Sequence, residues 1–260
     1  MIKKAKISVS VADLPINISP ERLFAFGKKL GIDGVEVVLG YKSFPPHIKL
    51  VKLSQKFGVP ILSLHQPQSF FKHLVSDDEM FLTASSLQVP VVIHPLKSTA
   101  IDSPAQKKYL RDLAKKSQKY RVRLLLENMS ESSTLPLYRY QKSDPSTTKI
   151  DMIVKSSNTY NFGVTLDTSH LKQPSPHKIV GFMKIMPSIE NIHLSDFTNK
   201  EQHLPLGSGV LQSNDFLTFL KMHQYQGLIT LELSPHLFIS QKEYFSWIEG
   251  SITLVKKILT

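Results

Sequence analysis

The sequence predicts an α/β fold, a single (β/α)8 barrel of parallel strands that takes in residues 1–260 as one domain. Short apolar runs alternate with helical segments along the whole chain, and this alternation is typical of a parallel sheet. The length of 260 residues is close to the ~250 residues typical of one such barrel. Six apolar runs also end on a carboxylate or an imidazole, as expected where barrel strands open into an active site.

Capping and turn residues set the limits of the predicted elements in the first half of the chain. Ser19 and Pro20 suit the N-cap and first position of a helix, and Gly31 and Gly34 form the turn that follows it. Pro95 closes the fourth strand. The predicted elements are strands at 6–11, 35–39, 61–65 and 89–94, and helices at 20–30, 46–57, 77–87 and 104–120.

The second half of the chain repeats the pattern with one polar interruption. Residues 130–148 contain Ser and Pro and fall where catalytic loops emerge, so they form either a lid over the site or a disordered insertion. The predicted elements are strands at 122–127, 162–166, 189–193 and 229–233, and helices at 150–160, 177–186, 214–223 and from 241 onward.

The composition excludes several classes of protein. Hydrophobic content of 41% supports a full core, but no apolar run reaches the ~20 residues that span a bilayer, so we expect no membrane segment. The basic start leads into a short apolar run without the features of a secretion signal. The absence of cysteine excludes disulfides and thiolate chemistry and fits a cytoplasmic protein. Any metal site must therefore use histidines and carboxylates.

The formal net charge of +11 is the main departure from average composition. It indicates either a partner that carries phosphates, such as DNA, or a basic solvated surface. The lysines are spread over many predicted helices without a stripe of arginine and aromatic residues, so the sequence favours the solvated surface.

Residues with metal-binding side chains stand at the ends of six predicted strands. The carboxyl ends of parallel strands meet at one edge of a barrel, so these side chains should converge. A lone histidine there more often makes a structural hydrogen bond, but clustered carboxylates repel one another and require a cation. The six residues are His65, His94, Glu127, Asp167, His193 and Glu232.

Part of this set suits a single divalent metal ion. Three anionic oxygens and one imidazole are suitable ligands for Mn2+, Co2+, Mg2+ or Zn2+. His170 follows Asp167 by three residues, so a turn could bring both to one rim. Glu36 interrupts the second strand and either contacts substrate in the barrel mouth or pairs locally. The candidate ligands of the single metal are Glu127, Asp167, His193 and Glu232.

Short motifs recur at these strand ends in a characteristic order. They are Leu-His-Gln-Pro at 64–67, Ile-His-Pro at 93–95, Leu-Glu-Asn at 126–128, Leu-Asp-Thr-Ser-His at 166–170, His-Leu-Ser-Asp at 193–196, His-Leu-Pro-Leu-Gly at 203–207 and Leu-Glu-Leu at 231–233. Their order, over nearly the whole chain, resembles the xylose-isomerase-like TIM-barrel superfamily. That superfamily contains sugar-phosphate isomerases and epimerases as well as abasic-site nucleases of the endonuclease IV type.

The resemblance to the isomerases and epimerases implies one divalent metal and a small carbohydrate or keto substrate. In that group Glu127 and Glu232 would be the catalytic residues, moving a proton between adjacent carbons through an enediolate. His170 would bind a substrate hydroxyl. Related barrels also include dehydratases.

The resemblance to the endonucleases implies up to three zinc ions and a DNA substrate. This chain carries Glu201 where those enzymes have aspartate, and Gln68 where an aromatic residue is expected, unless Phe70 or Phe71 substitutes. These departures favour the isomerase group, and a barrel that binds metal or ligand without turnover is a third possibility. The additional zinc ligands under this alternative are His65, His94, His170, Glu201 and His203.

Overall fold

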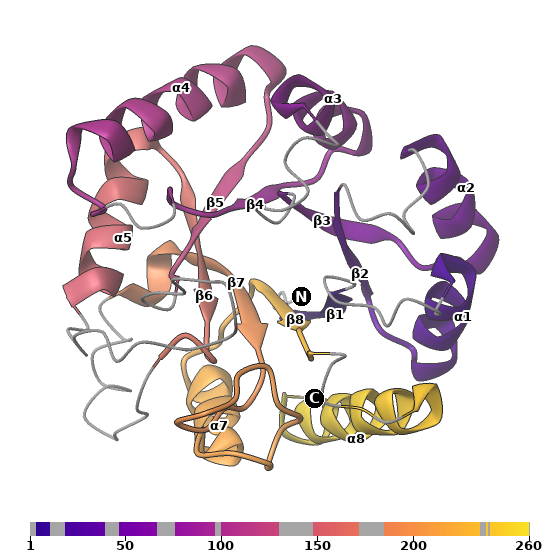
Figure 1. Ribbon diagram of the computed structural model, residues 1–260. Coiled ribbons are helices and arrows are strands. Elements are labelled where there is room, and N and C mark those ends of the chain that lie inside the picture. Colours follow the sequence, from indigo (N-terminus) through magenta and orange to yellow (C-terminus); the bar gives the residue numbers. More distant parts are fainter. Residues whose placement is uncertain are drawn as a thin grey trace.

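The computed structural model describes residues 4–10, 19–39, 47–66, 76–96, 100–129, 148–171, 185–234, 238 and 240–259. Parallel strands follow one another in chain order around a closed barrel, and β8 pairs with β1 (Figure 1). The predicted (β/α)8 barrel is therefore confirmed. The strands are β1 (Lys6–Ser10), β2 (Gly34–Val38), β3 (Ile61–His65), β4 (Val91–Ile93), β5 (Leu124–Glu127), β6 (Gly163–Asp167), β7 (Ile189–Leu194) and β8 (Leu228–Leu231).

The helices surround the strands on the outside of the barrel (Figure 1). Ser19 caps α1 as predicted, since its side-chain oxygen accepts a hydrogen bond from the backbone N–H of Arg22 at 3.3 Å. No helix within the described ranges is both long and apolar enough to cross a membrane. The helices are α1 (Pro20–Leu30), α2 (His47–Phe57), α3 (Asp77–Leu87), α4 (Pro104–Tyr120), α5 (Thr148–Tyr160), the 3-10 turn η1 (Met186–Ser188), α7 (Ser213–Met222) and α8 (Gln241–Leu259).

The predicted strand at 89–94 is shorter than expected. The backbone N–H of Val89 donates to Ala84 at 3.2 Å and so completes the end of α3 instead of joining β4. Pro90 has no N–H to pair. The polar segment predicted at 130–148 lies outside the described residues except for Thr148, which begins α5. The helix predicted at 177–186 lies outside them except for its last two residues.

The interior of the barrel is polar, and its helix-facing surface is apolar. Successive side chains of a strand point to opposite faces, and in β1, β3, β6, β7 and β8 buried polar residues alternate with apolar ones. In β1, Ser8 is buried and hydrogen-bonds to Thr230 of β8, whereas its neighbours Ile7 and Val9 belong to the apolar core. Because the interior is polar, it can hold charged side chains at its carboxyl end.

The last helix, α8, packs against the first helix, α1. Lys256 of α8 donates to the carbonyl oxygens of Leu30 and Gly31 at 2.6 and 2.7 Å, at the end of α1. The ring centroids of Phe26 in α1 and Phe245 in α8 lie 4.3 Å apart. The first and last parts of the described chain are thus held together by helix contacts as well as by strand pairing.

Candidate metal centre

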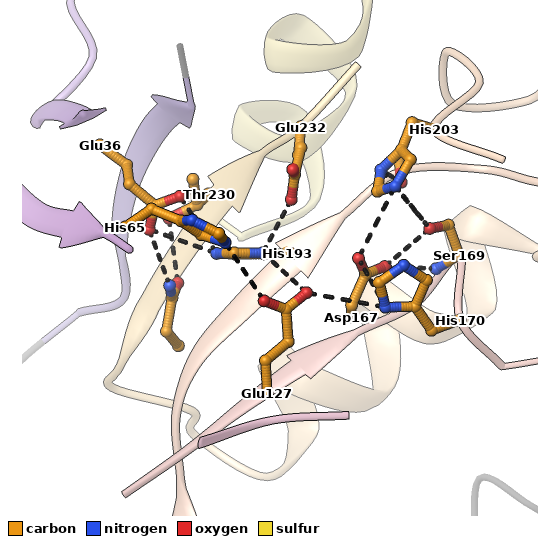
Figure 2. Close-up of polar contacts among 12 residues, drawn as sticks. Glu36, His65, Glu127, Asp167, Ser169, His170, His193, His203, Thr230 and Glu232 are labelled. Carbon is orange, nitrogen blue, oxygen red and sulfur yellow. Dashed lines mark hydrogen bonds and ion pairs between the residues drawn. The ribbon is translucent and has the colours of Figure 1, made fainter. Parts of the chain in front are cut away.

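The carboxyl ends of the strands bring most of the predicted ligands into three overlapping groups, and Figure 2 shows the members of two of them, the central and outer groups named below. Within each group, one nitrogen or oxygen atom of every residue lies within 4.8 Å of the others. We name them the central group (Glu127, Asp167, His193 and Glu232), the side group (His65, His94 and Glu127) and the outer group (Asp167, His170 and His203). Glu127 and Asp167 each belong to two groups.

The central group is buried at the carboxyl end of the barrel, with Glu232 its most exposed member at 7%. Nδ1 of His193 lies 2.7 Å from Oε2 of Glu232 and 3.4 Å from Oε1 of Glu127. Asp167 and His193 are 0% exposed, and Glu127 is 2% exposed. The four residues come from the ends of β5, β6, β7 and β8, so strand pairing fixes their spacing.

The side group joins β3, β4 and β5. Nε2 of His94 lies 3.0 Å from Nε2 of His65 and 3.0 Å from Oε2 of Glu127. Nδ1 of His65 is 2.7 Å from the carbonyl oxygen of Gln66 and must donate to it, which leaves Nε2 with a lone pair when the ring is neutral. Two imidazole nitrogens and a carboxylate oxygen at these distances suit a cation between them.

The outer group lies between β6 and the loop after β7. Nδ1 of His170 is 3.2 Å from Oδ2 of Asp167, and Nε2 of His203 is 4.0 Å from the same oxygen. Glu201 is exposed and belongs to none of the three groups that the described residues form. In this geometry Asp167, not Glu201, provides the carboxylate of the outer group.

The unpaired polar atoms of the central group fit a divalent cation. Oδ2 of Asp167, Nδ1 of His193 and Oε2 of Glu232 are buried and make no hydrogen bond among the described residues. Among the described residues these atoms are paired by charge alone, His193 with Glu232 at 2.7 Å and Asp167 with His170 at 3.2 Å, and a divalent cation would satisfy all three atoms at one point. Carboxylate oxygens and an imidazole nitrogen are the ligands expected for Mn2+, Co2+ or Zn2+.

The carboxylates and histidines of the centre shift one another's pKa values. Burial opposes ionisation of Glu232, but the charge of His193 outweighs it and lowers the pKa of Glu232 to about 2. Burial likewise opposes protonation of His65, yet the hydrogen bond and charge of Glu127 raise the pKa of His65 to about 9. Protons on the histidines therefore balance the carboxylates, and a bound cation would replace those protons.

Glu36 lies behind His193 and not in the open mouth of the barrel. Figure 2 shows Glu36 and Glu232 on opposite sides of the His193 ring. Glu36 is 0% exposed, and its Oε2 accepts a hydrogen bond from the hydroxyl of Ser63 at 2.8 Å. Of the two alternatives that the sequence offered for Glu36, its contacts match pairing with neighbouring side chains and not contact with a substrate.

Asn128 has a structural role that the sequence did not reveal, although it belongs to the motif at 126–128. Its side-chain amide donates to the carbonyl oxygen of Asp167 at 3.0 Å, and its side-chain oxygen accepts from the N–H of Asp167 at 2.8 Å. Its own carbonyl oxygen is 2.7 Å from Nδ1 of His170. Asn128 thus holds the end of β6 beside the end of β5.

Asp196 organises the loop that carries His203. Its carboxylate accepts backbone hydrogen bonds from Phe197, Gly207 and Leu211 at 2.8–2.9 Å. The carbonyl oxygen of His203 accepts from the N–H of Ser234, just after β8, at 2.9 Å. The motif at 193–196 placed Asp196 near the site, but its role depends on contacts up to 15 residues away.

Comparisons with known proteins agree with the barrel fold. The sequence pattern of the family described as xylose isomerase-like TIM barrel matches residues 24–246. No curated protein matches the sequence significantly.

Several solved structures share the fold over nearly their whole length. IolI protein with a bound zinc atom has a TM-score of 0.72 and 19% identity, covering 98% of this chain and 99% of that chain. The 3-keto-D-glucoside 4-epimerase YcjR from E. coli has a TM-score of 0.69 and 13% identity, covering 98% and 100%. D-allulose 3-epimerase from Methylomonas sp. in complex with D-allulose has a TM-score of 0.68 and 15% identity, covering 99% and 96%. At these identities the similarity is one of fold.

Proposed function

The chain belongs to the xylose isomerase-like TIM-barrel family, and from this premise we propose that it is a divalent-metal-dependent isomerase or epimerase of a small sugar or related keto compound. The central group of Glu127, Asp167, His193 and Glu232 would hold the metal. A divalent cation there would polarise a substrate carbonyl and acidify the adjacent C–H bond.

The observation that carries the proposal is the placement of two carboxylates around one point. Glu127 ends β5 and Glu232 follows β8, and both reach the same nitrogen of His193, at 3.4 and 2.7 Å. Figure 2 shows the two carboxylates approaching His193 from different directions. Two carboxylates on different sides of a bound substrate can remove a proton from one face and return one to another position.

His170 is the proposed contact for a substrate hydroxyl. Its Nδ1 lies 2.7 Å from the carbonyl oxygen of Asn128 and must act as the donor to it. Its Nε2 therefore remains available to accept a hydrogen bond. The D-allulose bound by one structural neighbour supports a ketose as the first substrate class to examine.

Exchange of substrate hydrogen with solvent tests this function directly. The Mn2+-, Co2+- or Zn2+-loaded protein would be incubated with D-allulose, D-tagatose and other ketoses in D2O, and deuterium at carbon would be measured by mass spectrometry. We expect incorporation by the wild type and a loss of about 10²-fold or more in Glu232→Gln, since general acid–base residues contribute that much.

Glu190→Gln is the matched control for that experiment. Glu190 is half-exposed, pairs with Arg123 and belongs to none of the three groups, so this variant should keep full activity. Full turnover and full metal content in Glu232→Gln would contradict the role of Glu232. Absence of exchange with every ketose tested, by protein shown to contain metal, would contradict the proposed function.

A zinc-dependent abasic-site endonuclease is a second candidate, which the side group favours. A single-metal isomerase does not require His65 and His94, whereas cations that share a bridging carboxylate can act together on a phosphodiester. The net charge of +11 also suits a DNA substrate. Under this alternative up to three zinc ions would occupy the side, central and outer groups.

Metal content separates the two candidates. Two or three zinc ions per chain, with one lost in His94→Ala, together with cleavage of a duplex that contains one abasic site, would support the endonuclease. A single metal that His94→Ala retains, without DNA cleavage, would leave the isomerase as the function.

A further inference from the structure

Glu36 lies at the centre of a buried polar layer directly beneath the central group. Its Oε2 accepts hydrogen bonds from the hydroxyl of Ser63 at 2.8 Å and from the side-chain amide of Asn191 at 3.3 Å. Nε2 of His193 lies 3.2 Å from the same oxygen. Glu36, Ser63, Asn191 and His193 are all 0% exposed, so water does not compete for these hydrogen bonds.

A series of linked hydrogen bonds that starts on β1 sets the direction of hydrogen bonding in this layer. Thr230 donates its only hydroxyl proton to Oδ1 of Asn191 at 2.9 Å, so Ser8 must donate to Thr230 across their 2.6 Å contact. With its oxygen facing Thr230, Asn191 presents its NH2 group to Glu36. Every hydroxyl and amide of the layer therefore donates toward Glu36.

This direction determines which nitrogen of His193 carries a proton. The carboxylate of Glu36 is the final acceptor of the chain, so Nε2 of His193 donates to it. In the neutral ring that binds a metal, Nδ1 then has the lone pair, and this is the atom that lies 2.7 Å from Glu232 and 3.4 Å from Glu127 in the metal-free protein. A histidine held in this way by a carboxylate is a better and more precisely oriented metal ligand.

We propose that Glu36 is a positioning residue that holds His193 as an Nδ1 ligand of the central metal. The inference rests on the proposed metal centre and extends it to a residue that touches neither metal nor substrate. The Ser8–Thr230–Asn191 chain contributes by fixing the orientation of the Asn191 amide. The buried layer thus links strands β1, β2, β3, β7 and β8 to a single metal ligand.

Zinc affinity and the N–H signal of His193 test the proposal. Dissociation constants would be measured by chelator competition for the full-length wild type, Glu36→Gln and Glu36→Asp. The Nε2–H proton of His193 would be followed by NMR of 15N-histidine-labelled, zinc-loaded protein.

Glu36→Gln removes the carboxylate but keeps the shape, whereas Glu36→Asp keeps the charge and withdraws it from His193. We expect both variants to bind zinc 10–100-fold more weakly and to lose or shift the slowly exchanging N–H signal.

Glu190→Gln is the matched control and should leave both measurements unchanged. Wild-type affinity and an unshifted N–H signal in both Glu36 variants would overturn the positioning role while leaving the metal centre intact. If Glu36→Gln fails to fold, wild-type affinity in a folded Glu36→Asp overturns the role in the same way. Absence of zinc binding by the wild-type protein would overturn the metal centre and this inference together.

Discussion

At the scale of single residues, the metal-free centre depends on protonated histidines. Burial opposes protonation of His193, but the nearby charges of Glu36 and Glu232 raise its pKa well above the ordinary value. His65 behaves similarly beside Glu127, with its pKa raised to about 9. In His94 burial outweighs the charge and hydrogen bond of Glu127, so the pKa of that side chain is lowered.

We expect the metal-free protein to lose stability between pH 7 and pH 9.5. A raised folded-state pKa means that the contribution of His65 is complete below the unfolded value of about 6.5 and disappears as the pH rises through about 9. The shift of His65 alone corresponds to roughly 3–4 kcal/mol, or about 7–14 °C in Tm. Thermal unfolding of chelator-treated protein, followed by circular dichroism, measures this.

Two comparisons make the pH prediction specific. His65→Asn should show a shallower decrease over the same pH range, because one of the titrating groups is gone. Zinc-saturated protein should also show little decrease, because the cation takes the place of the protons. An equal decrease in all three samples would show that groups outside the centre control it.

The convergence of the candidate ligands at the strand ends could be predicted from the sequence, whereas the contacts of Glu36 could not. Each ligand follows an apolar run, so strand periodicity alone places it at the carboxyl edge. Glu36 interrupts a strand, which shows that it faces the barrel interior but not what it contacts. Its partners Asn191 and Ser63 lie 155 and 27 residues away in the sequence. Polar residues at interior positions of several strands were the signal that could have indicated the layer.

At the scale of elements, the loop after β7 is as firmly fixed as a strand. Asp196 and Leu204 pair through two backbone hydrogen bonds of 2.8 Å, and His203 adopts a left-handed conformation with φ of 56°. A Cβ atom at Gly209 would lie 2.2 Å from the carbonyl oxygen of Phe197 and 2.4 Å from the carboxylate of Asp196. The close approach of Gly209 is thus part of what places His203 in the outer group.

We expect Gly209→Ala and Gly250→Ala to have opposite effects on stability. The first must displace the loop and should cost about 1–3 kcal/mol, with weaker binding of any metal that His203 ligates. Gly250 lies exposed in α8, and a Cβ atom added there would meet nothing within 4 Å, so alanine should add roughly 0.5–1 kcal/mol. Urea denaturation of both variants gives the comparison. A Gly209→Ala protein as stable as the wild type would show that the loop accommodates the methyl group.

At the scale of the whole molecule, the centre joins six consecutive strands. Its candidate ligands come from the ends of β3 through β8, and α8 packs against α1. A cation held by these residues would bind the folded barrel and not the unfolded chain, so binding and folding are coupled.

Removal of metal should therefore destabilise the entire barrel. At a free metal concentration about 100 times the dissociation constant, binding stabilises a protein by ~2.7 kcal/mol, which is roughly 5–10 °C in Tm at this size. Scanning calorimetry before and after chelation, and after zinc is restored, measures the change. Glu232→Gln should show a smaller change. A Tm that does not respond to metal in the wild type would contradict the metal centre.

The barrel itself followed from the sequence because each strand and helix carries its own local pattern. Alternating elements, capping residues such as Ser19 and strand-end ligands all agree on one architecture. Errors arose where a residue belonged to a neighbouring element, as Val89 belongs to the end of α3. The cross-barrel polar layer was not predictable locally, because it depends on strands β1 and β8 meeting after the barrel closes.

The sharing of Glu127 and Asp167 between groups has an evolutionary consequence. For cations held by these groups, a change in their number would need only a substitution at a histidine on the rim, such as His94 or His203, and would leave the shared carboxylates in place. A lineage with this architecture can therefore move between one-cation and several-cation chemistry in single mutational steps. Descendants of one ancestral barrel would then diverge in reaction class before they diverge in fold.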